Sequence, residues 1–251
     1  MKNNVNFSSS LAKFGIGVFE TIKVDKSPID IDIHIDRMFN SLSELNILIN
    51  NDKEFYKEEI LKYIKENNIE NKALRLTVFD EGYNISVRNI LYNKEMYEVG
   101  FRLNISPIRR GDSIIHRHKT TNYFENIYTK NYATENGYDD GIFLDAEDNI
   151  LECSMSNIFF IKDKQIFTIS DKFPILSGTV KRRIIEICGE LNIQLVETNI
   201  NIDEIKEFDF VFITNSIMEM MKVIEIEGIK FNNRNELFDK ITKAYKDKIY
   251  K

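Results

Sequence analysis

The sequence has few of the residues that build covalent or metal-bound frameworks. It holds two cysteines (Cys153 and Cys188), three histidines and no tryptophan. The spacing of the cysteines and histidines is typical of neither a disulfide framework nor a metal site, so we expect neither. No apolar run is long enough to cross a bilayer, and the N-terminus lacks the apolar segment of a signal peptide. We therefore expect no membrane contact and a reducing, cytoplasmic setting.

Positive charge is also in short supply. The 34 Lys and Arg residues are outnumbered by 40 Asp and Glu residues, for a formal net charge of -6. Non-specific attraction to nucleic acid is therefore disfavoured, and we expect no nucleic-acid partner. We interpret the basic pairs and triplets at 109–110 and 181–183 as solvated surface charge. The length of 251 residues suits one large domain or two modest ones.

Hydrophobic periodicity predicts a chain that mixes helices with strands. Amphipathic helices are expected at 34–42, at 52–66 and from residue 236 onward. Strands are expected at 14–24, 73–79, 83–89, 101–105, 150–161, 165–169 and 210–216. The polar and basic stretch 107–113 is the best candidate for a domain boundary.

A lysine stands just before a predicted helix. From Thr121 the apolar residues have helical spacing, and Thr120 or Thr121 is a plausible N-cap. Lys119 would then lie at the positive end of the helix dipole. That position lowers the pKa of its ammonium group and favours attack of the free amine on a carbonyl. The alternative is an ordinary solvated lysine.

A carboxylate interrupts an otherwise apolar strand at Glu152, just before a Ser-Met-Ser-Asn cluster at 154–157. If it is buried, Glu152 needs a cation or a protonated ring nitrogen as its partner. If the strand lies at a sheet edge, Glu152 instead faces water.

Three further features suit an anion. The helix entry Ser-Gly-Thr at 177–179 exposes backbone N–H groups, and the strand end Thr-Asn-Ser at 214–216 offers side-chain hydrogen bonds. Ordinary capping and turn chemistry is the alternative for both. Arg37, in the first turns of a predicted helix, either binds an anion or pairs with Asp32 or Asp36.

Together these features form the parts of a pyridoxal 5'-phosphate site. Such a site needs a lysine that binds the cofactor, a carboxylate that keeps the ring nitrogen protonated, and groups that hold the phosphate. Six stretches, in this order, resemble the class IV (fold-type IV) pyridoxal-phosphate enzymes: 14–22, 34–37, 119–123, 151–157, 176–179 and 214–218. That family includes branched-chain aminotransferases, D-amino-acid aminotransferases and 4-amino-4-deoxychorismate lyases.

The resemblance implies an α/β (α+β) fold with two domains. A small N-terminal α/β domain would span 1–108, an interdomain loop 109–117, and a larger, β-barrel-like α/β domain 118–251. The family works as a homodimer in which each subunit lends residues to its partner's site.

The resemblance also implies roles for individual residues. Lys119 would carry the cofactor and move the proton, and Glu152 would pair with the ring nitrogen. Thr21 would be a proton relay, although its hydroxyl could instead bond only to backbone. The remaining cofactor-binding residues would be Arg37, Leu176, Gly178, Thr179, Val180, Asn215 and Ser216. The candidates for binding a carboxylate substrate are Phe19, Arg75 and Arg88.

Within the family, Phe-Glu-Thr-Ile at 19–22 and Thr-Asn-Ser-Ile-Met at 214–218 look more like the lyases. The resemblance thus implies a 4-amino-4-deoxychorismate lyase that forms 4-aminobenzoate and pyruvate for folate synthesis. One alternative is an aminotransferase that acts on branched-chain or D-amino acids with a 2-oxo acid acceptor. Another is a non-catalytic dimeric protein of the same fold. Departures from the family pattern at Ile16, at 80–82 and at Glu219 and Lys222 bear on the substrate.

Overall fold

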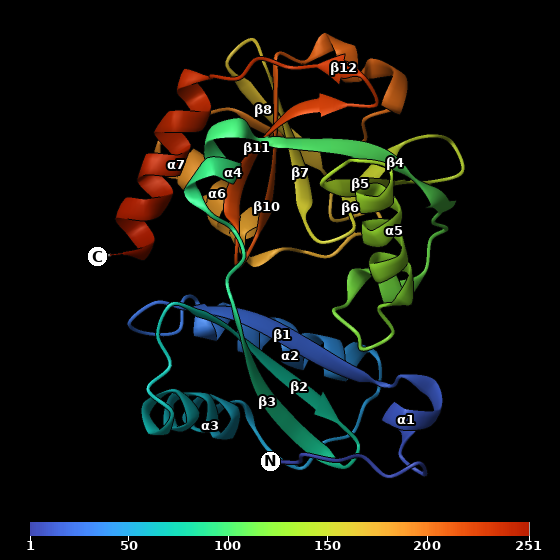
Figure 1. The fold of residues 1–251 in the computed structure, drawn as a ribbon, viewed down its shortest axis with the longest axis vertical. Coiled ribbons are helices and arrows are strands. Elements are labelled where there is room, and N and C mark those ends of the chain that lie inside the picture. The colour runs from blue at the N-terminus through green and yellow to red at the C-terminus, as the bar shows by residue number, and fades with distance from the viewer. Residues whose placement is uncertain (251) are drawn as a thin grey trace. The chain divides into compact units, whose positions relative to one another are not determined.

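The computed structural model describes residues 1–250, which form two compact units (Figure 1). The first unit comprises Met1–Leu91 and His118–Tyr123; the second comprises Tyr92–Arg117 and the chain from Phe124 onward. This division differs from the predicted one at 108 and 118. Residues 101–109 form a strand that pairs with strands of the second unit, whereas 118–123 run beside the first strand of the first unit.

The first unit is a three-stranded antiparallel sheet, in the order β1-β2-β3, with helices against one face. Its elements are α1 (Ser10–Phe14), β1 (Gly17–Val24), α2 (Ile31–Glu44), α3 (Lys53–Glu66), β2 (Lys72–Phe79) and β3 (Gly82–Asn89). Alternate residues of β1, among them Val18 and Ile22, enter a core with Met38 of α2 and Tyr56 of α3. The residues between them, among them Phe19, point to the other face of the sheet, as side chains alternate along a strand.

The second unit is built on a nine-stranded mixed sheet in the order β6-β5-β4-β11-β10-β7-β8-β9, with β12 paired to β11. Its strands are β4 (Phe101–Arg109), β5 (Asp140–Leu144), β6 (Ile150–Cys153), β7 (Asn157–Lys162), β8 (Gln165–Ile169), β9 (Leu195–Thr198), β10 (Phe210–Asn215), β11 (Glu219–Ile226) and β12 (Ile229–Lys230). Its helices are α4 (Lys94–Val99), η1 (Ile114–Arg117), α5 (Phe124–Glu135), α6 (Thr179–Glu190), η2 (Ile202–Glu207) and α7 (Glu236–Ile249).

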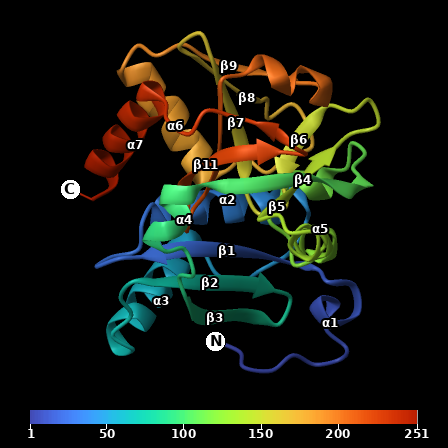
Figure 2. The ribbon, with the colours of Figure 1, turned by 45° about the horizontal axis from the view of Figure 1, so that its top comes forward.

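This large sheet curls strongly, so that edge strand β6 comes back toward β7 and β8 (Figure 2). The backbone N–H of Ile150 in β6 donates to the carbonyl of Ile200, which follows β9, at 2.8 Å. One face of the curled sheet holds the larger core, with Ile213 and Val223 among its members. The other face packs against α6 and α7 through a second core that includes Phe212 and Ile184.

The predicted mixed α/β fold with a curled second sheet is confirmed, with two local differences. Strand β4 continues through Pro107, which lies where its pairing with β5 is interrupted, so the boundary candidate 107–113 begins inside a strand of the second unit. The single strand expected at 150–161 is two strands, because residues 154–156 turn between β6 and β7. Within residues 1–250, no helix has the length and apolarity needed to span a membrane.

Candidate active site

Lys119 lies in an extended segment that pairs with β1 in the first unit. The N–H of Phe19 donates to the carbonyl of Lys119 at 2.8 Å, and the N–H of Thr121 donates to that of Gly17 at 2.9 Å. Helix α5 begins only at Phe124, so the prediction of a helix-terminal lysine capped by Thr120 or Thr121 is wrong. The hydroxyl of Thr121 bonds to the Gly15 carbonyl instead of a helix N–H, because strand pairing takes up this segment.

Two aromatic rings orient the amine of Lys119. Its Nζ lies 4.5 Å from the centre of the Phe19 ring and 5.1 Å from that of the Tyr123 ring. The two rings contact each other edge to face, with centres 5.2 Å apart. A cation over such ring faces is attracted to them electrostatically. The structure therefore brings together Phe19, predicted from the sequence, and Tyr123, which we did not single out.

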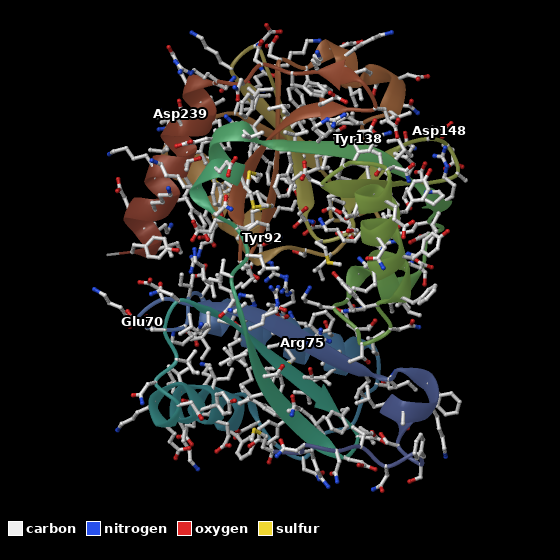
Figure 3. The ribbon with its side chains drawn as sticks, viewed as in Figure 1. Glu70, Arg75, Tyr92, Tyr138, Asp148 and Asp239 are labelled. Atoms are coloured by element: carbon white, nitrogen blue, oxygen red, sulfur yellow. The ribbon has the colours of Figure 1, made fainter. Side chains whose placement is uncertain are left out.

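The sheet face that carries Phe19 also carries the other predicted substrate-binding residues. Thr21 of β1 lies directly opposite Arg75 of β2 in the strand register. The guanidinium carbon of Arg75, which is labelled in Figure 3, lies 3.6 Å from the centre of the Phe19 ring. Burial lowers the pKa of Arg75, and the nearby Arg88 acts in the same direction. Arg88 points to this face because Ser86, two residues before it on β3, is the partner of Arg75.

Arg37 belongs to a buried cluster on the helix-covered side of β1. Its Nε and Nη2 donate to the two carboxylate oxygens of Glu20 at 2.8 and 2.5 Å. The Nδ1 of His34 lies 2.6 Å from one of these oxygens. Burial raises the pKa of Glu20, but the charges and hydrogen bonds of Arg37 and His34 outweigh it and lower that pKa to about 2. The structure thus pairs Arg37 with Glu20, whereas Asp32 and Asp36 pair with Lys57 and Lys53. A phosphate-binding role for Arg37 stays a prediction.

Glu152 is buried in the second unit, with two donors on its carboxylate. Its side chain is 8% exposed. Oε1 accepts from Nη1 of Arg110 at 2.9 Å, and Oε2 accepts from the N–H of Leu176 at 3.1 Å. Of the two alternatives for Glu152, the structure therefore shows the buried carboxylate that meets a cation.

That cation is a residue the sequence analysis placed wrongly. We expected the pair 109–110 to be solvated surface charge, and Arg109 does bind the exposed Asp148 at the surface. Arg110 is only 3% exposed, and its guanidinium lies 3.4 Å from the centre of the Phe143 ring. The sequence pointed to Arg110 only indirectly, because a buried Glu152 requires a cation from somewhere in the chain.

The start of α6 has the features of an anion site. Gly178 is the N-cap residue and offers no side chain to the free N–H groups of the first turn. A Cβ atom added at Gly178 would lie 1.9 Å from Oδ1 of Asn157, so only glycine fits there. Thr214, paired with Asn157 across β10 and β7, has a buried hydroxyl with no hydrogen-bond partner within residues 1–250. Backbone N–H groups, a glycine cradle and a spare hydroxyl together suit a phosphate group.

Asn215 serves the turn that follows β10. Its Oδ1 accepts from the N–H groups of Ile217 and Met218 at 3.0 and 2.7 Å, and its Nδ2 donates to the carbonyl of Met155. The alternative of ordinary turn chemistry thus describes this side chain. Ser216 is half-buried beside it. Contact of either residue with a cofactor stays a prediction.

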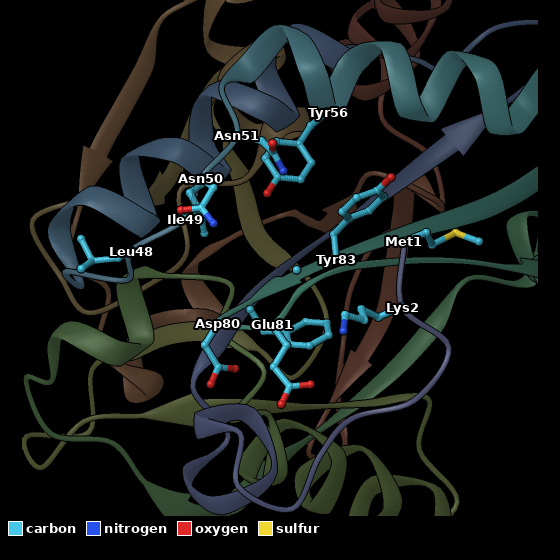
Figure 4. A pocket seen from close by; sticks show the side chains of 12 residues that line it. Met1, Lys2, Leu48, Ile49, Asn50, Asn51, Tyr56, Asp80, Glu81 and Tyr83 are labelled. Atoms are coloured by element: carbon cyan, nitrogen blue, oxygen red, sulfur yellow. The ribbon is translucent and has the colours of Figure 1, made fainter.

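The turn at 80–82, one of the departures from the family pattern, anchors the N-terminal segment. Asp80 accepts from the hydroxyl of Ser9 at 2.6 Å and from the N–H of Ser10 at 2.7 Å, at the start of α1. A pocket of the first unit lies at this turn (Figure 4). It is lined by Met1, Lys2, Leu48, Ile49, Asn50, Asn51, Tyr56, Phe79, Asp80, Glu81, Gly82 and Tyr83. None of these is a predicted site residue, so we assign it no role.

The sequence and the fold both match known proteins. The family model described as amino-transferase class IV matches residues 17–226. The chain belongs to the class IV aminotransferase family. A branched-chain-amino-acid aminotransferase of Pseudomonas aeruginosa is 26% identical over 93% of this chain and 84% of its own length. An aminodeoxychorismate lyase of Bacillus subtilis is 26% identical over 87% and 81%. The solved branched-chain amino acid aminotransferase of Escherichia coli has the same fold, with a TM-score of 0.90 at 23% identity over 98% and 90% of the two chains.

Class IV enzymes depend on pyridoxal 5'-phosphate, and this chain is therefore an enzyme that uses that cofactor on a small-molecule substrate. The second unit fits both ends of the cofactor. The N–H of Leu176 binds Glu152, and the α6 N-terminus with its glycine cradle follows two residues later. One short segment thus contacts a buried carboxylate and offers free backbone N–H groups, the groups that a ring nitrogen and a phosphate would need.

Proposed function

We propose that this class IV enzyme is a 4-amino-4-deoxychorismate lyase, which forms 4-aminobenzoate and pyruvate. The observation that supports this most is the pairing of Thr21 with Arg75 on the sheet face that carries Phe19. Lys119, the proposed cofactor lysine, has its amine over the same Phe19 ring. A hydroxyl and a guanidinium therefore lie beside the amine that would move the proton. The reaction would belong to folate synthesis.

The charges on this face favour a substrate with two carboxylates. Arg75 and Arg88 both point to it, and no carboxylate within residues 1–250 forms an ion pair with either. Arginine binds carboxylates through paired N–H donors, and burial strengthens such bonds at the half-buried Arg75, whereas Arg88 is exposed. Aminodeoxychorismate carries two carboxylates, whereas a branched-chain amino acid carries one and an apolar side chain. We propose that Phe19 packs on the six-membered ring of the substrate.

The proposed roles follow from the same contacts. When bound, the cofactor supplies a protonated ring that accepts electrons from the substrate. Lys119 takes the proton from the carbon that bears the substrate amine, and Glu152 holds the proton on the ring nitrogen. The backbone at Thr179 and Val180 binds the phosphate, with Gly178 leaving room for it. Leu176 covers one ring face, and Thr21 relays a proton to the leaving enolpyruvyl group as its C–O bond breaks.

An aminotransferase is the second candidate. It is favoured by the branched-chain aminotransferases among the relatives and by the shared fold of the Escherichia coli enzyme. The cofactor-binding residues would serve both reactions equally. The two candidates differ in whether an amino acid leaves its amine on the cofactor, and that difference can be measured directly.

The test uses purified enzyme loaded with pyridoxal 5'-phosphate. We expect aminodeoxychorismate to yield fluorescent 4-aminobenzoate, and a panel of L- and D-amino acids to leave the cofactor in its original form. Thr21→Val should lower the lyase rate about 100-fold, the usual contribution of a positioned proton donor. Ser86→Ala, which removes a hydroxyl from the same sheet face, is the matched control and should keep the rate. Rapid conversion of the cofactor to its pyridoxamine form, without aminobenzoate, would establish the aminotransferase instead.

A further inference from the structure

The buried carboxylate of Glu152 shares its environment with one arginine that no motif predicted. We propose that Arg110 is a positioning residue that keeps Glu152 ionised and fixed before the cofactor binds. This inference rests on the proposed pairing of Glu152 with the ring nitrogen. It assigns to Arg110 a role through Glu152 and not a contact with the substrate.

Every side of the Arg110 guanidinium is held. Nη1 donates to Glu152 at 2.9 Å, and Nη2 donates to Oδ1 of Asn126 at 3.1 Å. The amide of Asn126 is fixed in turn, because its Nδ2 donates to the carbonyl of Ser154 at 2.7 Å. Phe143 lies against the guanidinium plane. These contacts leave the side chain a single orientation, in which one N–H points at Oε1 of Glu152.

The Nε side of the Arg110 guanidinium, its outer side, faces a partly exposed carboxylate. Its Nε lies 3.4 Å from Oε2 of Glu125, whose side chain is 44% exposed. The same oxygen lies 3.3 Å from Nε2 of His116. Burial lowers the pKa of His116, and the positive charge of Arg110 acts in the same direction. Arg110 therefore joins a buried carboxylate to a partly exposed one, with its charge shared between them.

Without a cation, a carboxyl group as buried as Glu152 would favour its neutral form. A neutral carboxyl group already holds the proton that the ring nitrogen is to receive. An ionised one holds none, so the ring nitrogen has to bring a proton or take one from solvent as it binds. A protein with neutral Glu152 and one with ionised Glu152 therefore differ by about one in the number of protons taken up when the cofactor binds. This number can be measured, because proton uptake is linked to binding.

Other ionisable groups lie near Glu152 and have to be accounted for. His116 and Glu125 lie on the outer side, Asp140 lies in the neighbouring strand β5, and Cys153 follows Glu152 in β6. Lys130 faces Asp140 from α5. All five stay in place in every variant of Arg110 and Glu152, so their contributions cancel when variants are compared in pairs.

The experiment is a double-mutant cycle on proton uptake. Calorimetric titration of the cofactor-free protein with pyridoxal 5'-phosphate, in buffers of different ionisation enthalpy, counts the protons taken up. We expect Arg110→Gln to lower this number by about one when Glu152 is present, and to leave it unchanged in the Glu152→Gln background. Arg110→Lys keeps a cation and should stay close to wild type. Arg109→Gln, next in the chain but at the surface, is the control.

Equal changes in both Glu152 backgrounds, or no change in either, would overturn the proposal. If Arg110→Gln does not fold, infrared difference spectra between wild type and Glu152→Gln, both without cofactor, test the same point. A carboxylate signal at neutral pH is expected, and a protonated carboxyl signal would overturn the proposal. Because no substrate is present, both measurements are independent of whether the enzyme is a lyase or an aminotransferase.

Discussion

At the scale of single residues, two buried carboxylates of this chain each have a cationic partner. Glu20 lies between Arg37 and His34, and Glu152 lies between Arg110 and a backbone N–H. Removing one member of such a pair leaves an uncompensated charge, which costs far more than the pair contributes. These clusters are therefore places where a single substitution or a change of pH has a large effect.

The Glu20 cluster gives the clearest pH dependence. The pKa of this carboxyl is lowered from 4.5 to about 2 in the folded chain. A lowered pKa stabilises the folded state above the unfolded pKa, and that stability is lost as pH falls from about 4.5 toward 2. The expected contribution at neutral pH is about 3 kcal/mol of unfolding free energy. Urea unfolding between pH 2 and 7 measures it.

Glu20→Gln is the comparison for this measurement. It removes the titrating group, so the unfolding free energy of the variant should change less between pH 4.5 and 2 than that of wild type. Its stability at neutral pH should fall, since Arg37 then lacks its buried counter-charge. Parallel pH profiles for the two proteins would show that another carboxylate causes the loss.

At the scale of elements, local patterns predicted helices and strands well where one face is apolar. The alternation in β1 and the helical periodicity of α2 are properties of neighbouring residues, which the sequence displays. The segment 118–123 was mistaken for a helix entry because its partner, β1, lies about a hundred residues earlier in the chain. Pairing over such a separation leaves no local signal, and it overrode the capping preference of Thr120 and Thr121.

The residues of the candidate site also differ in whether the local sequence could identify them. Glu152 and Gly178 could be picked out because an acidic residue in an apolar strand and a small-residue helix entry are unusual locally. Arg110 could not be picked out, because its neighbour Arg109 has the same charge and lies at the surface. Only the fold decides which of two adjacent arginines is buried.

The close packing around Gly178 at the start of α6 leads to a prediction about a larger side chain there. Gly178→Ala places a Cβ atom where Oδ1 of Asn157 now lies, and Asn157 itself is bonded to the Leu176 carbonyl at 2.8 Å. We expect a loss of about 1–3 kcal/mol of unfolding free energy, as for other overpacked sites. Cofactor affinity should fall as well, because the displaced loop carries the N–H that binds Glu152. Thermal unfolding and cofactor titration measure the two effects.

Gly189 in the same helix is the matched control. A Cβ atom there meets nothing within 4 Å, and alanine favours the helix, so Gly189→Ala should be neutral or stabilising by up to about 1 kcal/mol. Cofactor affinity should not change in this control. If both variants bind the cofactor like wild type, the α6 entry is not the phosphate site.

At the scale of the whole molecule, one helix of the second unit presents apolar side chains to solvent. Phe124, Ile127 and Tyr128 of α5 have the spacing of neighbours on one helix face, and they are 73%, 48% and 46% exposed. The rings of Phe124 and Tyr128 lie against each other, with centres 6.2 Å apart. Contiguous exposed apolar groups mark interaction surfaces in soluble proteins. We propose that this face takes part in the expected homodimer.

The dimer prediction is tested by charge placed on that face. Light scattering coupled to size-exclusion chromatography should give the mass of two chains for wild type and of one chain for the Ile127→Glu and Tyr128→Lys double variant. Burial of a charge in an apolar interface is costly, so the shift should be complete at micromolar concentration. Leu61→Glu, on the exposed side of α3 in the first unit, is the control and should remain dimeric. A double variant that keeps the mass of two chains would exclude this face, and a single-chain mass for wild type would exclude the dimer itself.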